Sequence, residues 1–550
     1  MRRSLLSTAF ALFFVLSFAM PVAAQLPPLK GQPSAPPAEP PPPDCSHCKA
    51  KLKTIDTLRA QLPPDWSLAV VNEPVFNADV LVMQAGRMNA QTVLLVHGLG
   101  QNGFTDWLKV IPRLAQSHHV IAVDLPGFGY SSAPPGKYSP KNYARLLQWL
   151  LAAHGKGPAI VIGHSMGGAV SLRLASDHPA HVSRLVLVDA AGILHRMAFV
   201  KHTATVPVNV DKVHPLLKEP AARAKDYGNA VVERLFGLAT DPVRVLGQSE
   251  LAWGFLLRDR ANVNAGLALV EEDFSAAVHT LRQPTHVIWG EDDPVAPLRT
   301  GQLLAARLPR ATLHTLPATG HVPMDTATDS FLALLSFALD SDPAPAEPPA
   351  AAAAPARDLR CSGLVDREYR GHYREIVIDR CTAIRLRDVS AQRIVIRDSS
   401  VVMHNVAVAG DEVALDVTNS EVVGTAGDLR AAVAIRADAS RLDLAGYKIA
   451  ATSAVAEVKR RSRVIASISE VRSPAYTGYW HDTHDVEATT LAPGTPATAA
   501  SNLPSPASAG QGPGGFARGF AEHCSAPGER AAACQPQPRT AGEGRPVAAQ

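Results

Sequence analysis

The chain has 550 residues and a composition that is ordinary for a globular protein, with 46% hydrophobic and 19% charged residues. Its 53 basic and 50 acidic residues leave a formal net charge of +3, and basic residues do not cluster with interleaved aromatic residues. This balance excludes the strongly basic class of nucleic-acid-binding proteins. The length allows more than one domain, each with a core of its own.

The N-terminus has the pattern of a cleavable export signal. "MRRS" carries two positive charges, an apolar stretch follows, and small residues precede Gln25. Because the apolar stretch is shorter than a typical membrane span and Pro21 ends it, cleavage near Ala24 is favoured over a membrane anchor. We therefore predict a signal peptide at residues 1–24 and a mature protein that is periplasmic or secreted, where disulfides persist.

Segments rich in proline and alanine divide the rest of the chain. Residues 25–55 are predicted to be a linker that carries the motif "CSHC", and residues 342–358 a second linker. Residues 473–550 show little periodic apolar pattern and are predicted to be a disordered tail of low complexity. Two folded blocks remain, at residues 56–341 and 359–472.

The first block alternates buried strands with helices. Near-continuous apolar runs predict strands at 92–98, 119–127, 159–165, 184–192 and 285–293. Apolar residues at helical spacing predict helices at 106–117, 141–155, 167–179 and 330–340. This alternation is typical of a doubly wound α/β sheet. Residues with chemical roles are then expected just after the strands, because ligands bind at the carboxyl ends of such sheets.

A glycine-rich stretch follows the first of these strands. Gly98, Gly100 and Gly103 have the G-x-G-x-x-G spacing of dinucleotide-binding proteins, and Asp124 closes the next strand. That interpretation gives no role to a serine turn, an acid after a late strand and a histidine after the last strand. We therefore reject it and predict no cofactor and no metal.

The serine turn, Gly163–Gly167, reads G-x-S-x-G between a predicted strand and a predicted helix, which is the context of a nucleophile elbow. Ser165 is the candidate nucleophile, and a serine hydroxyl needs a base that is itself oriented by an acid. Chain order places the acid next and the histidine last. "GEDDP" offers Asp292 and Asp293 after a late strand, and His321 follows the last strand.

Five stretches, "HGLG", "DLPGFGYS", "GHSMGG", "WGEDDPVAP" and "TGH", together resemble the α/β-hydrolase superfamily, in particular its capped bacterial serine hydrolases, over residues 66–341. The family's G-x-x-D-x-x-x-P turn places the acid at Asp293, with Asp189 as the alternative because some members carry the acid after the earlier strand. The resemblance also implies an oxyanion hole formed by the backbone N–H groups of Leu99 and Met166.

The resemblance further implies a helical cap at about residues 193–281, inserted over the site. Trp253, Phe255 and Leu257 are candidate residues of an acyl pocket. Serine at position 165 argues against the family's haloalkane dehalogenases and epoxide hydrolases, which use aspartate there. Carbon–carbon bond hydrolases typically carry tryptophan after the catalytic histidine, whereas this chain has Val322.

The sequence therefore predicts an exported serine hydrolase that cleaves carboxylic esters, with a small-molecule or lipid-like substrate and no nucleic-acid partner. Two alternatives stay open. One is a carbon–carbon bond hydrolase of the same superfamily, and the other is a non-catalytic envelope or binding protein. The oligomeric state is left open.

The second block repeats a β-rich phrase with a small residue at each turn. Steps of 18, 21, 20 and 22 residues separate Cys381, Ser399, Ser420, Ser440 and Ser462. A period near twenty residues predicts a separate all-β domain of the β-solenoid type, with a β-sandwich as the alternative. We interpret it as a structural domain or as the binding surface for an envelope ligand.

The six cysteines form three local pairs, 45/48, 361/381 and 524/534. "CSHC" lacks a second pair of zinc ligands nearby, so an oxidised pair is favoured over a metal site. Cys361 precedes Cys381 by one period. Because adjacent strands lie about 4.8 Å apart and a disulfide tolerates Cα separations of roughly 4.4–6.8 Å, we predict a bridge between them.

Overall fold

The computed structural model describes residues 55–100, 102–198, 260–343 and 357–486, which all belong to one compact unit. The predicted signal peptide lies outside the described residues, as do the cysteine pairs 45/48 and 524/534. The candidate pocket residues Trp253, Phe255 and Leu257 also lie outside them. None of the described helices is long and apolar enough to cross a membrane.

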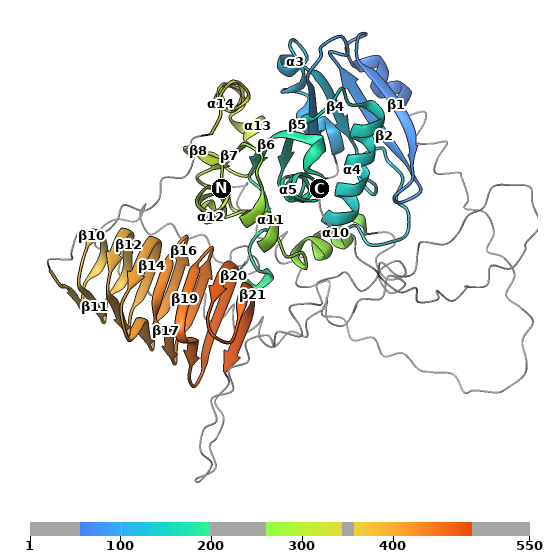
Figure 1. Ribbon diagram of the computed structural model, residues 1–550. Coiled ribbons are helices and arrows are strands. Elements are labelled where there is room, and N and C mark those ends of the chain that lie inside the picture. The colour runs from blue at the N-terminus through green and yellow to red at the C-terminus, as the bar shows by residue number, and fades with distance from the viewer. Residues whose placement is uncertain (1–54, 101, 199–259, 344–356, 487–550) are drawn as a thin grey trace, which may run out of the picture. The chain divides into compact units, whose positions relative to one another are not determined.

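The first block is built on one eight-stranded sheet with the order β1-β2-β4-β3-β5-β6-β7-β8 (Figure 1). β2 pairs antiparallel with both β1 and β4, and all the other pairs in this sheet are parallel. The strands are β1 (Ser67–Glu73), β2 (Ala78–Ala85), β3 (Thr92–Val96), β4 (His119–Val123), β5 (Ala159–His164), β6 (Val182–Val188), β7 (Thr285–Gly290) and β8 (Ala311–Leu316). The five predicted strands correspond to β3 to β7.

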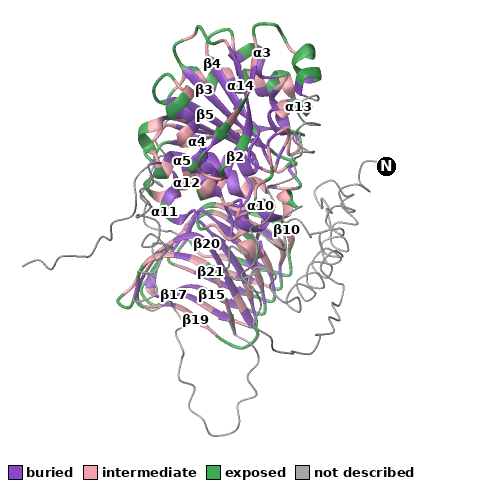
Figure 2. Cartoon of the chain, turned by 90° about the vertical axis from the view of Figure 1, so that its right-hand side faces the viewer, coloured by how far each residue is buried: buried purple, intermediate pink, exposed green. Residues whose placement is uncertain are grey.

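Helices cover both faces of this sheet, as the doubly wound prediction requires. The helical elements are η1 (Gly103–Trp107), α3 (Ile111–Leu114), α4 (Pro140–His154), α5 (Met166–Asp177), η2 (Pro179–His181), α10 (Ala261–Val270), α11 (Ser275–Thr280), α12 (Leu298–Arg307), α13 (Pro323–Thr326) and α14 (Thr328–Asp340). The core on one face contains α4, α5, α11 and α12, and the core on the other contains η1, α3 and α14. The central strands β3 and β5 are buried on both faces (Figure 2).

The predicted helix at 106–117 is wrong in its extent. The chain forms η1, a turn and the short α3 instead, and Pro112 lies within the first two positions of α3. Proline has no N–H to continue a preceding helix but fits the first turn of a new one. By contrast, α4 begins as the sequence suggests, because the Ser139 hydroxyl accepts from the Asn142 N–H and Pro140 follows it.

The second block is a sheet of parallel strands arranged in stacked coils (Figure 1). Even-numbered strands β10 to β20 form one row and odd-numbered strands β9 to β19 another. The strands are β9 (Leu359–Ser362), β10 (Val365–His372), β11 (Glu375–Asp379), β12 (Thr382–Ala391), β13 (Arg393–Arg397), β14 (Ser400–Ala409), β15 (Val413–Thr418), β16 (Glu421–Thr425), β17 (Asp428–Asp438), β18 (Arg441–Ala445), β19 (Lys448–Val458) and β20 (Ser462–Arg472). Because sandwiches are built from antiparallel sheets, this pairing excludes the alternative β-sandwich. We call this block the coil domain.

A ladder of serines explains the repeated small residue. The N–H groups of Cys381, Ser399, Ser420 and Ser440 each donate to the hydroxyl of the next residue in the series, at 2.9–3.2 Å, ending at Ser462. Each serine hydroxyl also donates to the carbonyl two residues earlier in its own coil. A larger side chain without a hydroxyl could not replace this buried pairing, so the small polar residue recurs with the coil.

The residue before each ladder position has a positive φ of 47–53°, which turns the chain inward. These residues are Arg380, Asp398, Asn419, Ala439 and Arg461. Only Asn and Asp adopt this conformation with local hydrogen-bonding help, so the other three positions carry backbone strain.

The ladder begins at the predicted disulfide. Cys361 and Cys381 are bonded, with their Cα atoms 6.7 Å apart. The bridge does not join directly opposed residues, because Cys361 lies opposite Ile378 in the strand register. It connects one strand to the turn of the next coil.

The predicted disordered tail is wrong at its start. Residues Thr477–Val486 form β21, which pairs antiparallel with β20. The antiparallel direction ends the repeat of parallel strands. The strand also covers the edge of β20, whose unpaired backbone groups could otherwise pair with another chain. The sequence pattern did not predict β21, because this strand does not follow the period of about twenty residues.

Two arginines of α12 bind the coil domain. Arg299 donates to both carboxylate oxygens of Asp443, at 2.7 and 3.0 Å. Arg307 donates to Asp428 at 3.1 Å and to the Gly427 carbonyl at 2.8 Å. These two ion pairs are largely buried, with 5% of the Asp443 and 8% of the Arg307 side chain exposed. The coil domain therefore holds both ends of the helix that follows the β7 turn.

We expect Ser420→Ala to lower the free energy of unfolding by about 1–3 kcal/mol, because it leaves the buried Ser399 N–H without its hydrogen-bond partner. It also removes one of the two hydrogen bonds that the Thr418 carbonyl accepts. Urea unfolding of the full chain measures the change. Ser453→Ala is the matched control, since Ser453 is an exposed residue of β19, and it should change stability by less than about 0.5 kcal/mol. Equal effects of the two substitutions would contradict the ladder's role.

Candidate active site

Ser165 lies at a sharp turn between β5 and α5. Its backbone has φ 54° and ψ −122°, a strained conformation for a residue with a side chain. The flanking glycines allow the turn, since a Cβ on Gly163 would lie 2.3 Å from the Gly167 carbonyl oxygen, and one on Gly167 would lie 2.3 Å from that of Val96. The crowding leaves no space for other residues and keeps the Ser165 side chain at the carboxyl end of the sheet.

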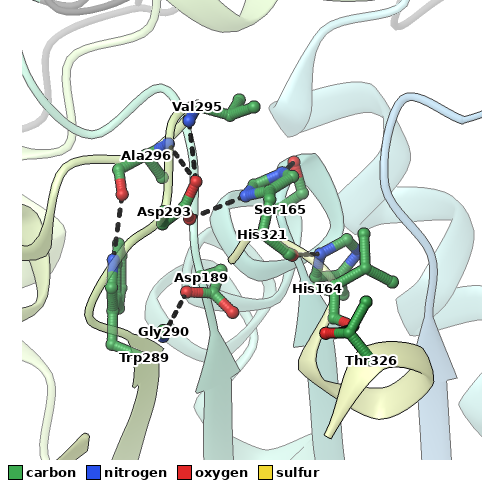
Figure 3. A network of polar contacts seen from close by, with 11 residues as sticks. His164, Ser165, Asp189, Trp289, Gly290, Asp293, Val295, Ala296, His321 and Thr326 are labelled. Atoms are coloured by element: carbon green, nitrogen blue, oxygen red, sulfur yellow. Dashed lines mark hydrogen bonds and ion pairs between the residues drawn. The ribbon is translucent and has the colours of Figure 1, made fainter. Parts of the chain in front are cut away.

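The structure brings Ser165, His321 and Asp293 into one hydrogen-bonded chain (Figure 3). The Ser165 Oγ lies 2.9 Å from the His321 Nε2, and the His321 Nδ1 lies 2.7 Å from the Asp293 Oδ2. With Nδ1–H donating to the carboxylate, Nε2 is the acceptor for the serine hydroxyl. The three residues follow β5, β8 and β7, so the sheet collects them from segments far apart in the sequence.

The turn after β7 holds the Asp293 carboxylate in place. Its Oδ1 accepts hydrogen bonds from the N–H groups of Val295 and Ala296, at 2.7 and 3.0 Å (Figure 3). The Trp289 indole donates to the Ala296 carbonyl and fixes the same turn. Oδ2 is left to face His321. Asp292 is exposed and its N–H donates to the Thr319 carbonyl, so it is a turn residue rather than a partner of His321.

Asp189, the alternative acid, is fully buried below the site. In the described part of the chain it forms a hydrogen bond with Gly290 and none with His321. Its Oδ1 accepts from the Gly290 N–H at 2.8 Å, and its Oδ2 forms no hydrogen bond with any of the described residues. Burial and the neighbouring Asp293 charge raise the pKa of Asp189 to about 9. The group is therefore neutral at pH 7, and a neutral acid cannot balance a charged imidazole.

Two further histidines support the site as neutral residues. The His164 Nε2–H donates to the His321 carbonyl at 2.7 Å, and burial lowers the pKa of His164 to about 3. The His97 Nε2 accepts from the Leu125 N–H, and burial lowers the pKa of His97 to about 4. His164 thus positions the backbone of the β8 turn, and His97 connects the ends of β3 and β4.

The predicted oxyanion-hole residues lie beside Ser165. Met166 is the first residue of α5, where helix N–H groups are free to bind an anion. Leu99 follows β3 in a loop that approaches Ser165 closely, since a Cβ on Gly98 would lie 3.0 Å from the Ser165 Cβ. The role of the Leu99 and Met166 N–H groups as donors to a bound oxygen stays a prediction.

The glycine pattern after β3 has a structural explanation. The Asp124 carboxylate accepts from the N–H groups of Phe104 and Tyr130, at 2.6 and 2.8 Å. A Cβ on Gly103 would lie 2.1 Å from this carboxylate. Asp124 therefore ties two loops together in place of contacting a ribose. Among the described residues, no cluster of His, Cys, Asp and Glu side chains is arranged to hold a metal ion.

Sequence reasoning missed the two supporting roles beneath the site. A histidine inside "GHSMG" gives no signal that its ring reaches the backbone of a residue 157 positions later. Asp189 was identified as a rival acid from its position after β6, but only burial reveals that it is neutral.

A family model described as alpha/beta hydrolase fold matches residues 91–328. The chain is 31% identical over 238 residues to 2-hydroxymuconate semialdehyde hydrolase of a Pseudomonas species, covering 42% of this chain and 80% of that protein. It is 29% identical over 237 residues to the uncharacterized hydrolase YugF of Bacillus subtilis, covering 42% of this chain and 84% of that protein.

Among solved structures, a thermophilic esterase from Thermogutta terrifontis aligns with a TM-score of 0.37 and 21% identity, over 50% of this chain and 98% of that chain. The sheet order, the serine turn and the similarity to 2-hydroxymuconate semialdehyde hydrolase agree. The chain belongs to the family with the alpha/beta hydrolase fold.

Proposed function

We propose that the protein is an exported serine hydrolase that cleaves carboxylic esters through an acyl-enzyme intermediate. The observation that carries this proposal is the hydrogen-bonded chain from the strained Ser165 through His321 to the Asp293 carboxylate. A serine with its hydroxyl hydrogen-bonded to an oriented imidazole is an activated nucleophile.

In the proposed mechanism, the Ser165 Oγ attacks the ester carbonyl and the His321 Nε2 takes the hydroxyl proton. The carbonyl oxygen becomes negative and accepts from the Leu99 and Met166 N–H groups, each worth about 3 kcal/mol to the transition state. Collapse breaks the bond to the alkoxide, which receives the proton from His321. Water then gives a proton to His321, attacks the acyl carbonyl and releases the carboxylic acid as Ser165 regains its proton.

Export is supported by the charged and apolar N-terminal pattern described above. The disulfide between Cys361 and Cys381 agrees with it, because such bonds persist in oxidising compartments and are rare in the cytosol. A periplasmic or secreted enzyme would meet esters from the envelope or the surroundings.

The second candidate is a carbon–carbon bond hydrolase, favoured by the similarity to 2-hydroxymuconate semialdehyde hydrolase. Val322 follows His321 where the resemblance leads one to expect tryptophan in that group, and the export signal is unexpected for a catabolic enzyme of the cytoplasm. The ester is therefore the favoured substrate. A purely non-catalytic role is disfavoured, because the nucleophile, base and acid are all present and in contact.

We expect a fluorophosphonate probe to label the mature protein at Ser165 and to leave Ser165→Ala unlabelled. A panel of carboxylic esters of increasing acyl length should be turned over, and Ser165→Ala and His321→Ala should each lower kcat by at least about 10⁴-fold, because the residues act as a unit. Mass spectrometry of the labelled peptide locates the adduct.

The same enzyme preparation, given a 2-hydroxy-6-oxo-dienoate, decides between the two candidates. Faster turnover of the dienoate than of every ester would assign the carbon–carbon reaction. No labelling and no turnover of either class by folded protein would rule out the proposed activity.

We expect Asp293→Asn to lower kcat/KM by about 10⁴-fold, because an amide stabilises the wrong imidazole tautomer and does not balance its charge. Asp189→Asn should lower it less than tenfold, since the native Asp189 is already neutral at pH 7. Initial rates on a short-chain ester measure both. The opposite order of the two variants would transfer the acid's role to Asp189.

The protonation of Asp189 can be measured separately through stability. The pKa of Asp189 is about 9 in the folded protein and about 3.9 in the unfolded chain. Between these two pH values the carboxyl is protonated in the folded state and ionised in the unfolded state. Stability from this group is therefore lost as pH rises from about 4 to about 9. We expect the Tm of Asp189→Asn, relative to the unmodified protein, to rise between pH 5 and pH 8. An unchanged difference would show that Asp189 is ionised at both pH values.

A further inference from the structure

The coil domain carries an open groove of about 870 Å³ that the hydrolytic chemistry does not use. It runs across the coils from the end of β14, over β17 and β19, to the end of β20 and the start of β21. The register of β17 against β19 shifts between Ala431 and Val433, and such a bulge bends the strand.

Two arginines line the groove at a fixed spacing. The strand register aligns Ala409, Arg430, Ala450 and Arg472 on four successive strands. Since neighbouring strands lie about 4.8 Å apart, the two arginines are separated by about 10 Å along the stack. Alanine at the intervening position leaves the space between them open.

These two guanidinium groups are available to a ligand. Arg430 is exposed and forms no ion pair within the part of the chain that the structure describes. Arg472 pairs with Glu470, but 71% of the Arg472 side chain is exposed, and an exposed ion pair contributes about 0–1 kcal/mol. A bound anion can therefore compete for Arg472 at little cost.

The rest of the lining indicates a hydroxyl-rich ligand. Ala409 and Ala450 are aligned with the two arginines in the strand register, so their methyl groups lie on the same face and give the groove an apolar surface. Thr452, Thr477 and Asp411 also line the groove and supply hydroxyl and carboxylate groups. An apolar surface with polar groups beside it suits the face and the hydroxyls of a sugar ring.

We propose that this groove binds a linear acidic polysaccharide, with Arg430 and Arg472 each contacting an anionic group on alternate sugars. The spacing fits this ligand better than other polyanions. A nucleic-acid strand places a charge about every 3.4 Å along its axis, so about two further charges would lie between the arginines, where the aligned residue is the alanine Ala450. An extended acidic peptide presents side chains on one side about every 6.6 Å, which does not match the separation of about 10 Å. Binding here would hold the enzyme on an anionic glycan and requires no residue of the active site.

Isothermal titration of the full-length mature protein with an oligogalacturonate tests the proposal, because this oligomer carries a carboxylate on every sugar. An uncharged maltooligosaccharide of equal length is the comparison ligand. We expect the oligogalacturonate to bind and the neutral oligomer to bind at least about tenfold more weakly, the effect of losing a charge-assisted contact.

Arg430→Gln and Arg472→Gln should each weaken binding by about tenfold or more, and Ala450→Glu should abolish it by placing a carboxylate between the two arginines. Arg397→Gln is the matched control, since Arg397 is an exposed arginine of β13 outside the groove, and it should bind as the unmodified protein does. Circular dichroism and Tm of each variant verify the fold.

Three results would overturn the proposal. They are no binding of oligogalacturonate, an equal loss in Arg397→Gln, and tighter binding of polyglutamate or single-stranded DNA than of the glycan. Ser165→Ala should bind the oligogalacturonate unchanged, so the result does not depend on the proposed ester hydrolysis.

Discussion

The close approach of the Ser165 turn to the loop after β3 is the constraint on which the site depends. Gly163 and Gly167 allow backbone atoms to approach to distances that any Cβ would block. The strained Ser165 backbone costs about 1–3 kcal/mol, which the surrounding packing must offset. The sheet offsets it with the N–H of Ser165 bonded to the Val188 carbonyl and with α5 packed on the buried strands. The nucleophile is thus placed by the core rather than by a flexible loop.

A second feature of the site is the burial of three titratable groups around the hydrogen-bonded chain. His97, His164 and Asp189 surround the chain from Ser165 to Asp293, and burial keeps all three neutral at pH 7. Two backbone N–H groups donate hydrogen bonds to the Asp293 carboxylate. Such donors stabilise a carboxylate more than a neutral carboxylic acid. A charge on Asp189 would repel Asp293 and weaken the orientation of His321. The neutral neighbours therefore determine which carboxylate can act on the histidine.

The sequence predicted those parts of the molecule that local patterns encode. Near-continuous apolar runs located β3 to β7, and the spacing of small residues located the coils. The identity of the three site residues followed from chain order and the resemblance, because each lies at a recognisable turn after a strand. What local patterns could not encode is long-range contact. The hydrogen bond from His164 to the His321 carbonyl, the burial of Asp189 and the antiparallel β21 all depend on residues far away in the sequence. The proline that divides the helix predicted at 106–117 was visible, but its effect depends on the turn that packing imposes.

The coil domain, like the turn at Ser165, contains residues with strained positive φ values. In the coil domain, a ladder of hydrogen bonds stabilises the turns that contain them. At each inward turn a residue adopts a positive φ, and the next residue places a small polar side chain in the interior. Burying a hydroxyl without a hydrogen-bond partner costs free energy. Each serine hydroxyl in the ladder both accepts and donates a hydrogen bond, which offsets this cost. A ladder of this kind needs a defined first member, and Cys381 provides it, since its N–H enters the ladder while its sulfur is bonded to Cys361. At the other end of the domain, the contacts of Asp428 and Asp443 with α12 extend this rigid stack to the helix that follows the Asp293 turn. Because that turn places the acid beside His321, the contacts of α12 connect the repeat to the segment that carries the acid.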